Sequence, residues 1–301
     1  MARKQKKSKS DLYLSDRQPL TKMGAVGLGL TYLVLILYAA NVIWPIAQIV
    51  ISSFNANQQQ YIRIDPATDY RFSFHHFEFL FKETNFFKWL RNTIFIASGS
   101  TLVTLVIVSF TGYAYSRFRF KGRKASLLTI MLIQIIPTFA GITAYFTLHS
   151  IISSIVPGFS RQMMLVAIYA GGGIASNTFI MKGYMDSVSM ELDEAAKIDG
   201  CSNMKVYRMI ILPIVRPMLA IVALWSFIGP FTDYMLPKVL LTTPSDYTMA
   251  TGLFSLVSDH RNMNQPAFAA GSVLTAIPIV ALFMLLQNQL VSGLAAGSVK
   301  G

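Results

Sequence analysis

The chain has 301 residues, of which 53% are hydrophobic and 13% are charged, and its formal net charge is +12. This charged fraction is about half of that in soluble globular proteins. Asp, Glu, Lys and Arg are absent from six long runs, namely 23–54, 92–116, 125–160, 162–181, 217–232 and 262–299. Such runs can hold the roughly 17 to 25 apolar residues that cross a bilayer as a helix. The composition therefore excludes a soluble enzyme and predicts an all-α polytopic membrane protein.

Several kinds of reactive site are also excluded. The single cysteine, Cys201, leaves no disulfide within the chain and no cysteine-rich metal cluster. The four histidines lack the spacing of a zinc site, and segment 122–126 lacks the spacing of a phosphate-binding loop. We therefore expect no catalytic residue, no metal ligand, no cofactor site and no ATP-binding loop in this chain.

Taken in chain order, the apolar runs predict six transmembrane helices, near 24–50, 93–115, 125–149, 163–182, 217–237 and 268–291. The first run is longer than a bilayer requires, so this helix should tilt or project beyond the lipid. We expect no cleavable signal peptide, because segment 41–45 continues the helix. The predicted organisation is a basic tail (1–23), a first span with an extracellular loop (24–92), a core of five spans (93–291) and a C-terminal tail (292–301).

The distribution of Lys and Arg predicts the orientation. Alternate connections carry eighteen of these residues on one side and eight on the other. Because short cytoplasmic connections are enriched in Lys and Arg, both termini are expected in the cytoplasm. Loop 117–124 is the strongest indication, with five basic residues and no acid. A basic stripe beside lipid is typical of a topology determinant, so we expect contact with membrane lipid and none with nucleic acid.

Two outer segments have distinctive compositions. The first is rich in aromatic residues, which favours either an interfacial segment along the headgroups or a packed lid on the helices. These residues are Phe72, Phe74, Phe77, Phe79, Phe81, Phe86, Phe87 and Trp89. The second, loop 238–266, is long enough to fold back and touch an extracellular partner.

The cytoplasmic connection 186–217 has strong helix signals. Ser189 is a candidate N-cap, and three acids occupy the first turns, where the helix dipole favours negative charge. Lys197 lies within salt-bridge reach of Asp193 and Glu194. Leu192, Ala195 and Ala196 are expected to share an apolar face. Gly200 then supplies a helix stop that tolerates positive φ.

A second helix is expected from about Met204 to Leu212, ending or kinking at Pro213, before Pro217 opens the next span. The result is two short helices at a sharp turn. This shape suits insertion into a groove on another protein, although an ordinary surface hairpin gives the same periodicity.

Segment 194–200 reads Glu-Ala-Ala-Lys-Ile-Asp-Gly, and Ile210-Ile211-Leu212-Pro213 follows it. This pattern resembles the EAA loop of permease subunits of bacterial ABC importers. The resemblance implies the type I importer permease fold and a coupling helix that docks in a cleft of a cytoplasmic ATPase subunit. The residues implied in this coupling are Glu194, Ala195, Ala196, Asp199, Gly200, Leu212 and Pro213.

The resemblance extends from about Trp89 to the end of the chain. Segment 112–122 resembles the family's basic loop, and segment 290–301 resembles the terminus of the six-span subunit of maltose and maltodextrin importers. There the tail reaches the ATPase dimer interface, which implies contacts by Gly297, Val299, Lys300 and Gly301. The resemblance also implies a bacterial cytoplasmic membrane location, a second permease subunit, two ATPase subunits that bind ATP and Mg, and an extracellular solute-binding protein.

Polar residues at membrane depth could line a path for a hydroxyl-rich solute, and our candidates are Gln134, Asn177 and Asp233. Hydrogen bonding between helices is the competing explanation. Gly171-Gly172-Gly173 favours close helix packing over a hinge. Together with this polar path between uncharged spans, the resemblance implies an importer of maltose or maltodextrin, which is the favoured function. The alternatives are an importer of another sugar or of glycerol phosphate, and an ion-coupled carrier, which the uncharged centres of the spans disfavour.

Overall fold

A computed structural model describes residues 22–56, 72–135, 138–259 and 263–298. These described residues form helices and no strand, apart from one isolated antiparallel bridge between Asn55 and Phe72. The all-helical expectation is therefore confirmed for this part of the chain. The chain divides into two units, residues 1–49 and 50–301, and each is described by itself.

Helix α2 (Lys22–Ser53) contains the first predicted span. Within its portion Val26–Ser53, an 18-residue window has a mean hydropathy of 2.1, and Pro45 lies inside the helix. At 1.5 Å per residue a helix of this length measures about 48 Å, which exceeds the thickness of a bilayer core. The helix is therefore long enough to cross with tilt, as expected. Residues 1–21 of the predicted basic tail lie outside the described residues.

The second unit contains the remaining helices. In chain order these are α3 (His75–Glu83), α4 (Phe86–Arg117), α5 (Arg123–Ile133), the 3-10 helix η1 (Thr138–Gly141), α6 (Ile142–Ile155), α7 (Arg161–Asp186), α8 (Glu191–Ile198), α9 (Asn203–Val206), the π-helix η2 (Tyr207–Ile211), α10 (Leu212–Ile214), α11 (Arg216–Thr232), α12 (Met235–Leu240), the 3-10 helix η3 (Pro244–Asp246), α13 (Met249–Ser255) and α14 (Gln265–Ser298).

Four of the six predicted spans correspond to single long helices. Helices α2, α4, α7 and α14 are long and apolar enough to cross a membrane, and α9 to α11 make a fifth candidate that is bent by 74°. The predicted helix 125–149 is wrong as a continuous element, because α5 ends at Ile133 and η1 and α6 follow. The predicted helix 217–237 is likewise too long, since α11 ends at Thr232 and α12 begins at Met235. The number of spans stays a prediction.

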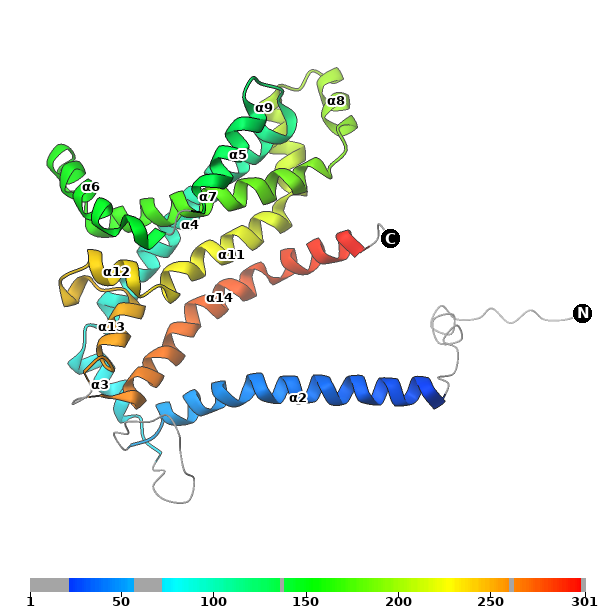
Figure 1. Cartoon of the computed structure of the whole chain (residues 1–301). Helices are drawn as coiled ribbons and strands as arrows, with labels where there is room; N and C mark the ends of the chain where they lie inside the picture. Colours follow the sequence, from blue (N-terminus) through cyan, green and yellow to red (C-terminus); the bar gives the residue numbers. More distant parts are fainter. Residues whose placement is uncertain (1–21, 57–71, 136–137, 260–262, 299–301) are drawn as a thin grey trace, which may run out of the picture. The chain divides into compact units, whose positions relative to one another are not determined.

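Helix α4 is the centre of the second unit. It packs along α7, and both helices pack against α11, which also contacts α14 (Figure 1). The close approach of α4 to α7 depends on Gly112, because a Cβ there would lie 2.6 Å from Cγ of Met181. Buried apolar residues of α4, α7, loop 186–217 and α11 form one continuous cluster that includes Val108, Met185 and Ile211.

The two ends of α4 contact different segments. Figure 1 shows α3, α12 and α13 near the start of α4, whereas α8 and α9 lie near its end. At the first end, Nε1 of Trp89 donates to the Pro244 carbonyl at 2.7 Å, and the hydroxyl of Thr93 accepts from the Met249 amide at 2.7 Å. Loop 238–266 is therefore fixed to the start of α4 as a fold-back segment.

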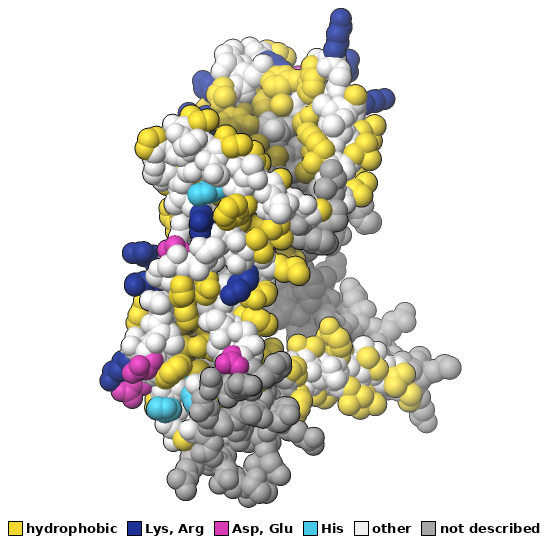
Figure 2. All heavy atoms as spheres, turned by 60° about the vertical axis from the view of Figure 1, so that its left-hand side comes forward, with side chains coloured by type: hydrophobic (Ala, Val, Ile, Leu, Met, Phe, Trp, Pro, Cys, Tyr) yellow, Lys and Arg dark blue, Asp and Glu magenta, His cyan; other side chains and the backbone are white. Residues whose placement is uncertain are grey.

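The surface of the second unit exposes many apolar side chains. Figure 2 shows them in patches on one face, between white areas and a number of charged groups. Leu102, Trp225 and Leu285 are 65%, 69% and 75% exposed, as expected of helices that contact lipid or a partner. In the aromatic segment Phe86 and Trp89 are buried, as a packed lid requires, while other members are largely exposed. The exposed members are Phe72, Phe74, Phe81 and Phe87. The position of the segment along the headgroups stays a prediction.

Candidate functional site

Helix α8 forms where the sequence signals placed it. Its first turn contains Glu191, Asp193 and Glu194, where acids stabilise the helix dipole. The hydroxyl of Ser189 accepts from the Glu191 amide at 3.2 Å, although the N-cap is Met190. Gly200 adopts φ +79°, and the Cys201 amide donates to the Ala196 carbonyl at 2.9 Å. The predicted glycine stop is therefore confirmed as a left-handed helix terminus.

The second half of the loop is helical, as expected. The hydroxyl of Ser202 caps α9 by accepting from the Lys205 amide at 3.4 Å. The π-helix η2 and α10 follow without a gap, so the predicted helix from about Met204 to Leu212 is confirmed, with a π-helical turn inside it and a bend after Ile214. Single-turn π-helices are frequent at functional sites, because the widened turn redirects side chains.

Asp193 and Ala196 form the inner face of α8. They are 4% and 7% exposed, and Ala196 belongs to the buried cluster that contains Met181 and Met185 of α7. Of the three residues that were expected to share an apolar face, Ala196 is buried against the chain, whereas Leu192 is 44% exposed and Ala195 is also exposed. The buried side of α8 therefore includes Asp193 beside Ala196.

The buried partner of Asp193 is Arg117, the last residue of α4. Its Nε lies 2.9 Å from Oδ2 of Asp193, and both side chains are 5% exposed. The guanidinium also donates to the carbonyls of Met185 at 3.1 Å and Val188 at 3.0 Å. Asp193 was expected to pair with Lys197 along α8; it pairs with α4 instead. Arg117 is a site residue that the local sequence pattern did not single out.

Two tyrosines fix the rest of the loop to α4. The hydroxyl groups of Ser109 and Tyr207 lie 2.5 Å apart, and Tyr113 donates to the Asn203 carbonyl at 3.2 Å. The Tyr113 and Tyr207 rings are also in contact, with centroids 5.1 Å apart. Because Ser109, Tyr113 and Arg117 recur every four residues, they lie on one face of α4. This face is the base on which the loop rests.

The outer surface of α8 faces solvent, and we call it the α8 outer face: Leu192, Glu194, Ala195, Ile198 and Asp199. All five residues are exposed, and Ile198 reaches 86%. Gly200 is exposed beside them, whereas Leu212 and Pro213 are half-buried in the loop. Of the residues implied in ATPase coupling, Ala196 therefore contacts the chain itself, while Glu194, Ala195, Asp199 and Gly200 remain open to a partner.

The C-terminal tail, which was also predicted to contact the ATPase, is described only in part. Helix α14 continues to Ser298 and includes Gly297. Val299, Lys300 and Gly301 lie outside the described residues. The contact of this tail with an ATPase stays a prediction.

The three predicted path residues do not share a cavity. Gln134 lines a cavity of about 510 Å³ between α5, α6 and α7, together with Gly171 and Gly172. Neither Asn177 nor Asp233 lines this cavity. The Asn177 amide donates to the Gly173 carbonyl of its own helix at 2.7 Å. Because this bond lies within α7, it supports neither a path residue nor the competing explanation of hydrogen bonding between helices.

Asp233 lies in the break between α11 and α12. Its Oδ2 accepts from the Tyr169 hydroxyl at 2.9 Å, and its Oδ1 accepts from the Leu236 amide at 3.3 Å. The first bond joins α7 to the break, and the second satisfies a free amide at the start of α12. The carboxylate thus has two partners within the chain.

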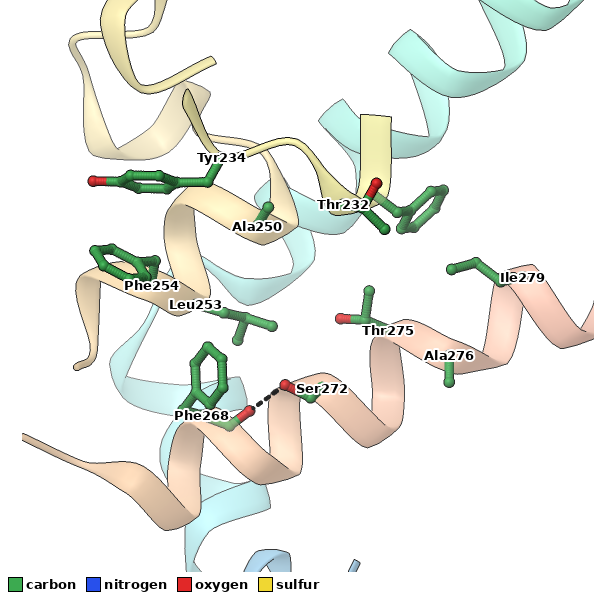
Figure 3. A pocket seen from close by; sticks show the side chains of 11 residues that line it. Thr232, Tyr234, Ala250, Leu253, Phe254, Phe268, Ser272, Thr275, Ala276 and Ile279 are labelled. Carbon is green, nitrogen blue, oxygen red and sulfur yellow. Dashed lines mark hydrogen bonds between the residues drawn. The ribbon is translucent and has the colours of Figure 1, made fainter. Parts of the chain in front are cut away.

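A second cavity, of about 370 Å³, lies beside this break (Figure 3). It is largely apolar and lies between α13, α14 and the end of α11. The rings of Tyr234 and Phe254 lie 4.3 Å apart on one side. The Ser272 hydroxyl donates to the Phe268 carbonyl at 2.8 Å, as Figure 3 shows. Its donor is therefore already used within α14.

The comparisons with known proteins define the class of protein that has this fold and loop. The family model of the binding-protein-dependent transport system inner membrane component matches residues 104–295. This range includes the end of α4, loop 186–217 and the helices that follow. The chain belongs to this family.

Relatives within the family match almost the whole chain. The maltodextrin transport system permease protein MdxG of Bacillus subtilis is 42% identical over 90% of this chain and 95% of its own length. MalD of Streptococcus pneumoniae, a maltodextrin permease protein, is 40% identical with the same coverage. The galactooligosaccharides permease protein GanQ of Bacillus subtilis is 41% identical, also with this coverage.

Solved structures share the fold. A chain of a bacterial ABC transporter involved in the import of the acidic polysaccharide alginate matches with a TM-score of 0.72. The match is 19% identical in sequence and covers 90% of this chain and 99% of that chain. A structure of a bacterial alginate transporter with its periplasmic protein gives a TM-score of 0.64 over 86% of this chain. The importer permease fold is thereby confirmed.

Proposed function

We propose that this chain is a non-catalytic transmembrane subunit of an ATP-driven, binding-protein-dependent importer of maltodextrin. It forms half of the translocation path together with a second permease subunit. Two cytoplasmic ATPase subunits, which bind ATP and Mg, dock against loop 186–217, and an extracellular solute-binding protein delivers the sugar. The single observation that supports coupling best is the α8 outer face, which is exposed on a helix whose inner face is firmly anchored.

The chemistry of this face suits a protein groove. Leu192 and Ile198 expose apolar surface at 44% and 86%, beside the carboxylates of Glu194 and Asp199. Aliphatic groups surrounded by charges are typical of a specific protein interface. Because Asp193 and Ala196 already hold α8 to α4 and α7, a docked partner would bind a preformed surface.

Docking is tested by placing a charge on the α8 outer face. Ala195→Glu should leave the chain in the membrane and remove most of the ATPase from the purified complex, because a carboxylate would have to be buried in the groove. Ala125→Glu is the matched control, since Ala125 is an exposed helical alanine of α5. Equal ATPase recovery with both variants, with transport intact, would refute the docking site.

The substrate proposal has support from two sources. MdxG and MalD, both named as maltodextrin permease proteins, are 42% and 40% identical to this chain. The helix centres also carry no Lys or Arg that would recognise a phosphate or carboxylate. GanQ, a galactooligosaccharides permease protein, is similar at 41%, so a galactooligosaccharide is the second candidate.

The substrate is tested with the full complex in proteoliposomes. Labelled maltotriose should enter only when ATP and the binding protein are both present. Uptake of a galactooligosaccharide without maltotriose uptake would select the second candidate. Uptake of glycerol phosphate alone would refute both sugars while leaving the importer architecture in place. ATP-independent uptake driven by an ion gradient would refute the proposed function itself.

A further inference from the structure

Arg117 connects three parts of the chain through one buried side chain. It ends α4, its Nε lies 2.9 Å from Oδ2 of Asp193 in α8, and its terminal nitrogens donate to the carbonyls of Met185 and Val188. The first carbonyl belongs to the last turn of α7, and the second lies in the turn that leads to α8. The contact of Nε with Asp193 is an ion pair without hydrogen-bond geometry, whereas the two terminal nitrogens make directed hydrogen bonds, for which a planar guanidinium is suited.

The burial of Arg117 and Asp193 restricts the movement of both side chains. Both charged side chains are 5% exposed, so solvent and salt screen their attraction weakly. A long side chain on the surface can change its rotamer and keep its hydrogen bonds by binding water. The guanidinium of Arg117 would lose its contacts with Asp193, Met185 and Val188 if it moved. Among the hydrogen bonds and ion pairs of the described residues, the Arg117–Asp193 pair is the one that joins α4 directly to α8.

The position of Arg117 in α4 gives the pair a larger significance. Helix α4 has 32 residues, and its first turns hold the fold-back loop through Trp89, Asn92 and Thr93. The Asn92 amide donates to the Ser245 carbonyl at 3.0 Å. At 1.5 Å per residue, the continuous helix from Trp89 to Arg117 measures about 42 Å. One helix therefore contacts the fold-back loop at its start and α8 at its end.

We propose that Arg117 is the positioning residue that makes α8 and α4 move as one body. The inference rests on the proposed function, since it assumes that an ATPase moves α8. Movement of α8 is then transmitted through the ion pair to α4. It continues along α4 to the fold-back loop 238–266. Arg117 contacts no substrate; it acts by fixing the orientation of α8 relative to the membrane helices.

The test uses the complete complex in proteoliposomes and measures sugar transported per ATP hydrolysed. Asp193→Asn should keep the ATPase bound and hydrolysing, but should lower this ratio about tenfold, within the usual range of coupling between sites. Asp193→Glu keeps the charge and should restore most of the ratio. Lys82→Gln is the matched control, because it removes an exposed ion pair, with Glu78, that lies within α3 alone.

If the ion pair only stabilised the folded chain, the Asp193→Asn variant would give a different result. The amount of complex, its ATP hydrolysis and its transport would then fall together, and the ratio would stay at the value of the unmodified complex. That outcome, or an unchanged ratio with normal amounts of Asp193→Asn complex, would overturn the proposal. Both outcomes leave the proposed function intact, provided that the unmodified complex transports sugar and Ala195→Glu loses the ATPase.

A second variant covers the case in which Asp193→Asn fails to accumulate. Arg117→Cys with Asp193→Cys, in a Cys201→Ser background, removes both charges together, so neither is left buried without a partner. A reducible thiol cross-linker that joins the two cysteines should raise the transport ratio, and reduction of the same sample should lower it again. Equal ratios before and after reduction would overturn the proposal.

Discussion

Asp193 and Ala196 are the buried residues of α8. They are three positions apart in the sequence and therefore lie on the same side of the helix. Their neighbours Glu194 and Ala195 point the other way and are exposed. Adjacent alanines of the same motif therefore have different tasks. Ala195 is available to a partner, and Ala196 fills space between α8 and α7.

This difference predicts opposite outcomes for the same substitution. Ala196→Glu should destabilise the chain by at least about 2 kcal/mol, because it buries an unpaired carboxylate. Ala195→Glu should leave stability unchanged. The amount of folded chain in membranes and the thermal midpoint of the detergent-purified protein measure both effects. Equal stability of the two variants would show that α8 rests differently on α7.

The buried ion pair of Arg117 was beyond local sequence analysis. The acids in the first turn of α8 were interpreted through the helix dipole, and Asp193 was placed within salt-bridge reach of Lys197 in the same helix. The partner of Asp193 in the structure lies 76 positions earlier, at the end of another helix. Removing one partner of such a buried pair usually costs about 3–5 kcal/mol. Only the three-dimensional arrangement shows this contact, because hydrophobic periodicity carries no information on pairs of distant charges.

At the scale of elements, the length of the uncharged, apolar runs located the four long helices. It did not predict the breaks in the other two segments. Runs of uncharged residues located α2, α4, α7 and α14, because each is continuous. The same criterion joined α5 to α6, because the residues between them are uncharged. The predicted span 217–237 also joined α11 to α12, although the uncharged run ends at residue 232. The polar Asp233 marks the second break, where it binds Tyr169 and the start of α12.

The break at Asp233 has a testable role of its own. Asp233→Ala should lower stability by about 1–2 kcal/mol, because it removes a helix cap and the bond to Tyr169. Asp233→Asn, which keeps an acceptor oxygen, should be close to the unmodified protein. Thermal unfolding of the purified complex gives the comparison. If Asp233 instead contacts the solute, Asp233→Asn should keep its stability and change the KM of uptake.

At the scale of the whole chain, the orientation in the membrane stays a prediction from the eighteen-to-eight distribution of Lys and Arg. It places Cys201 inside and loop 238–266 outside. Thr243 is exposed in that loop, whereas Cys201 is partly buried beside Gly200. The two positions therefore report on opposite sides of the membrane.

An impermeant thiol reagent tests this orientation in intact cells. Thr243→Cys in a Cys201→Ser background should react with the reagent, because its side chain would face the exterior. Native Cys201 should react only after the membrane is opened. Labelling of Cys201 in sealed cells would reverse the orientation, and loop 186–217 would then lie on the side away from ATP.

The exposure of Ile198 has a consequence for how much of this chain a cell can hold. An isoleucine that is 86% exposed on a preformed helix offers chaperones and proteases the same apolar surface that it offers a partner. Chains made in excess should therefore be removed, while chains covered by a partner persist. We expect the lifetime of the chain, and hence the ratio of subunits in the membrane, to follow the supply of that partner.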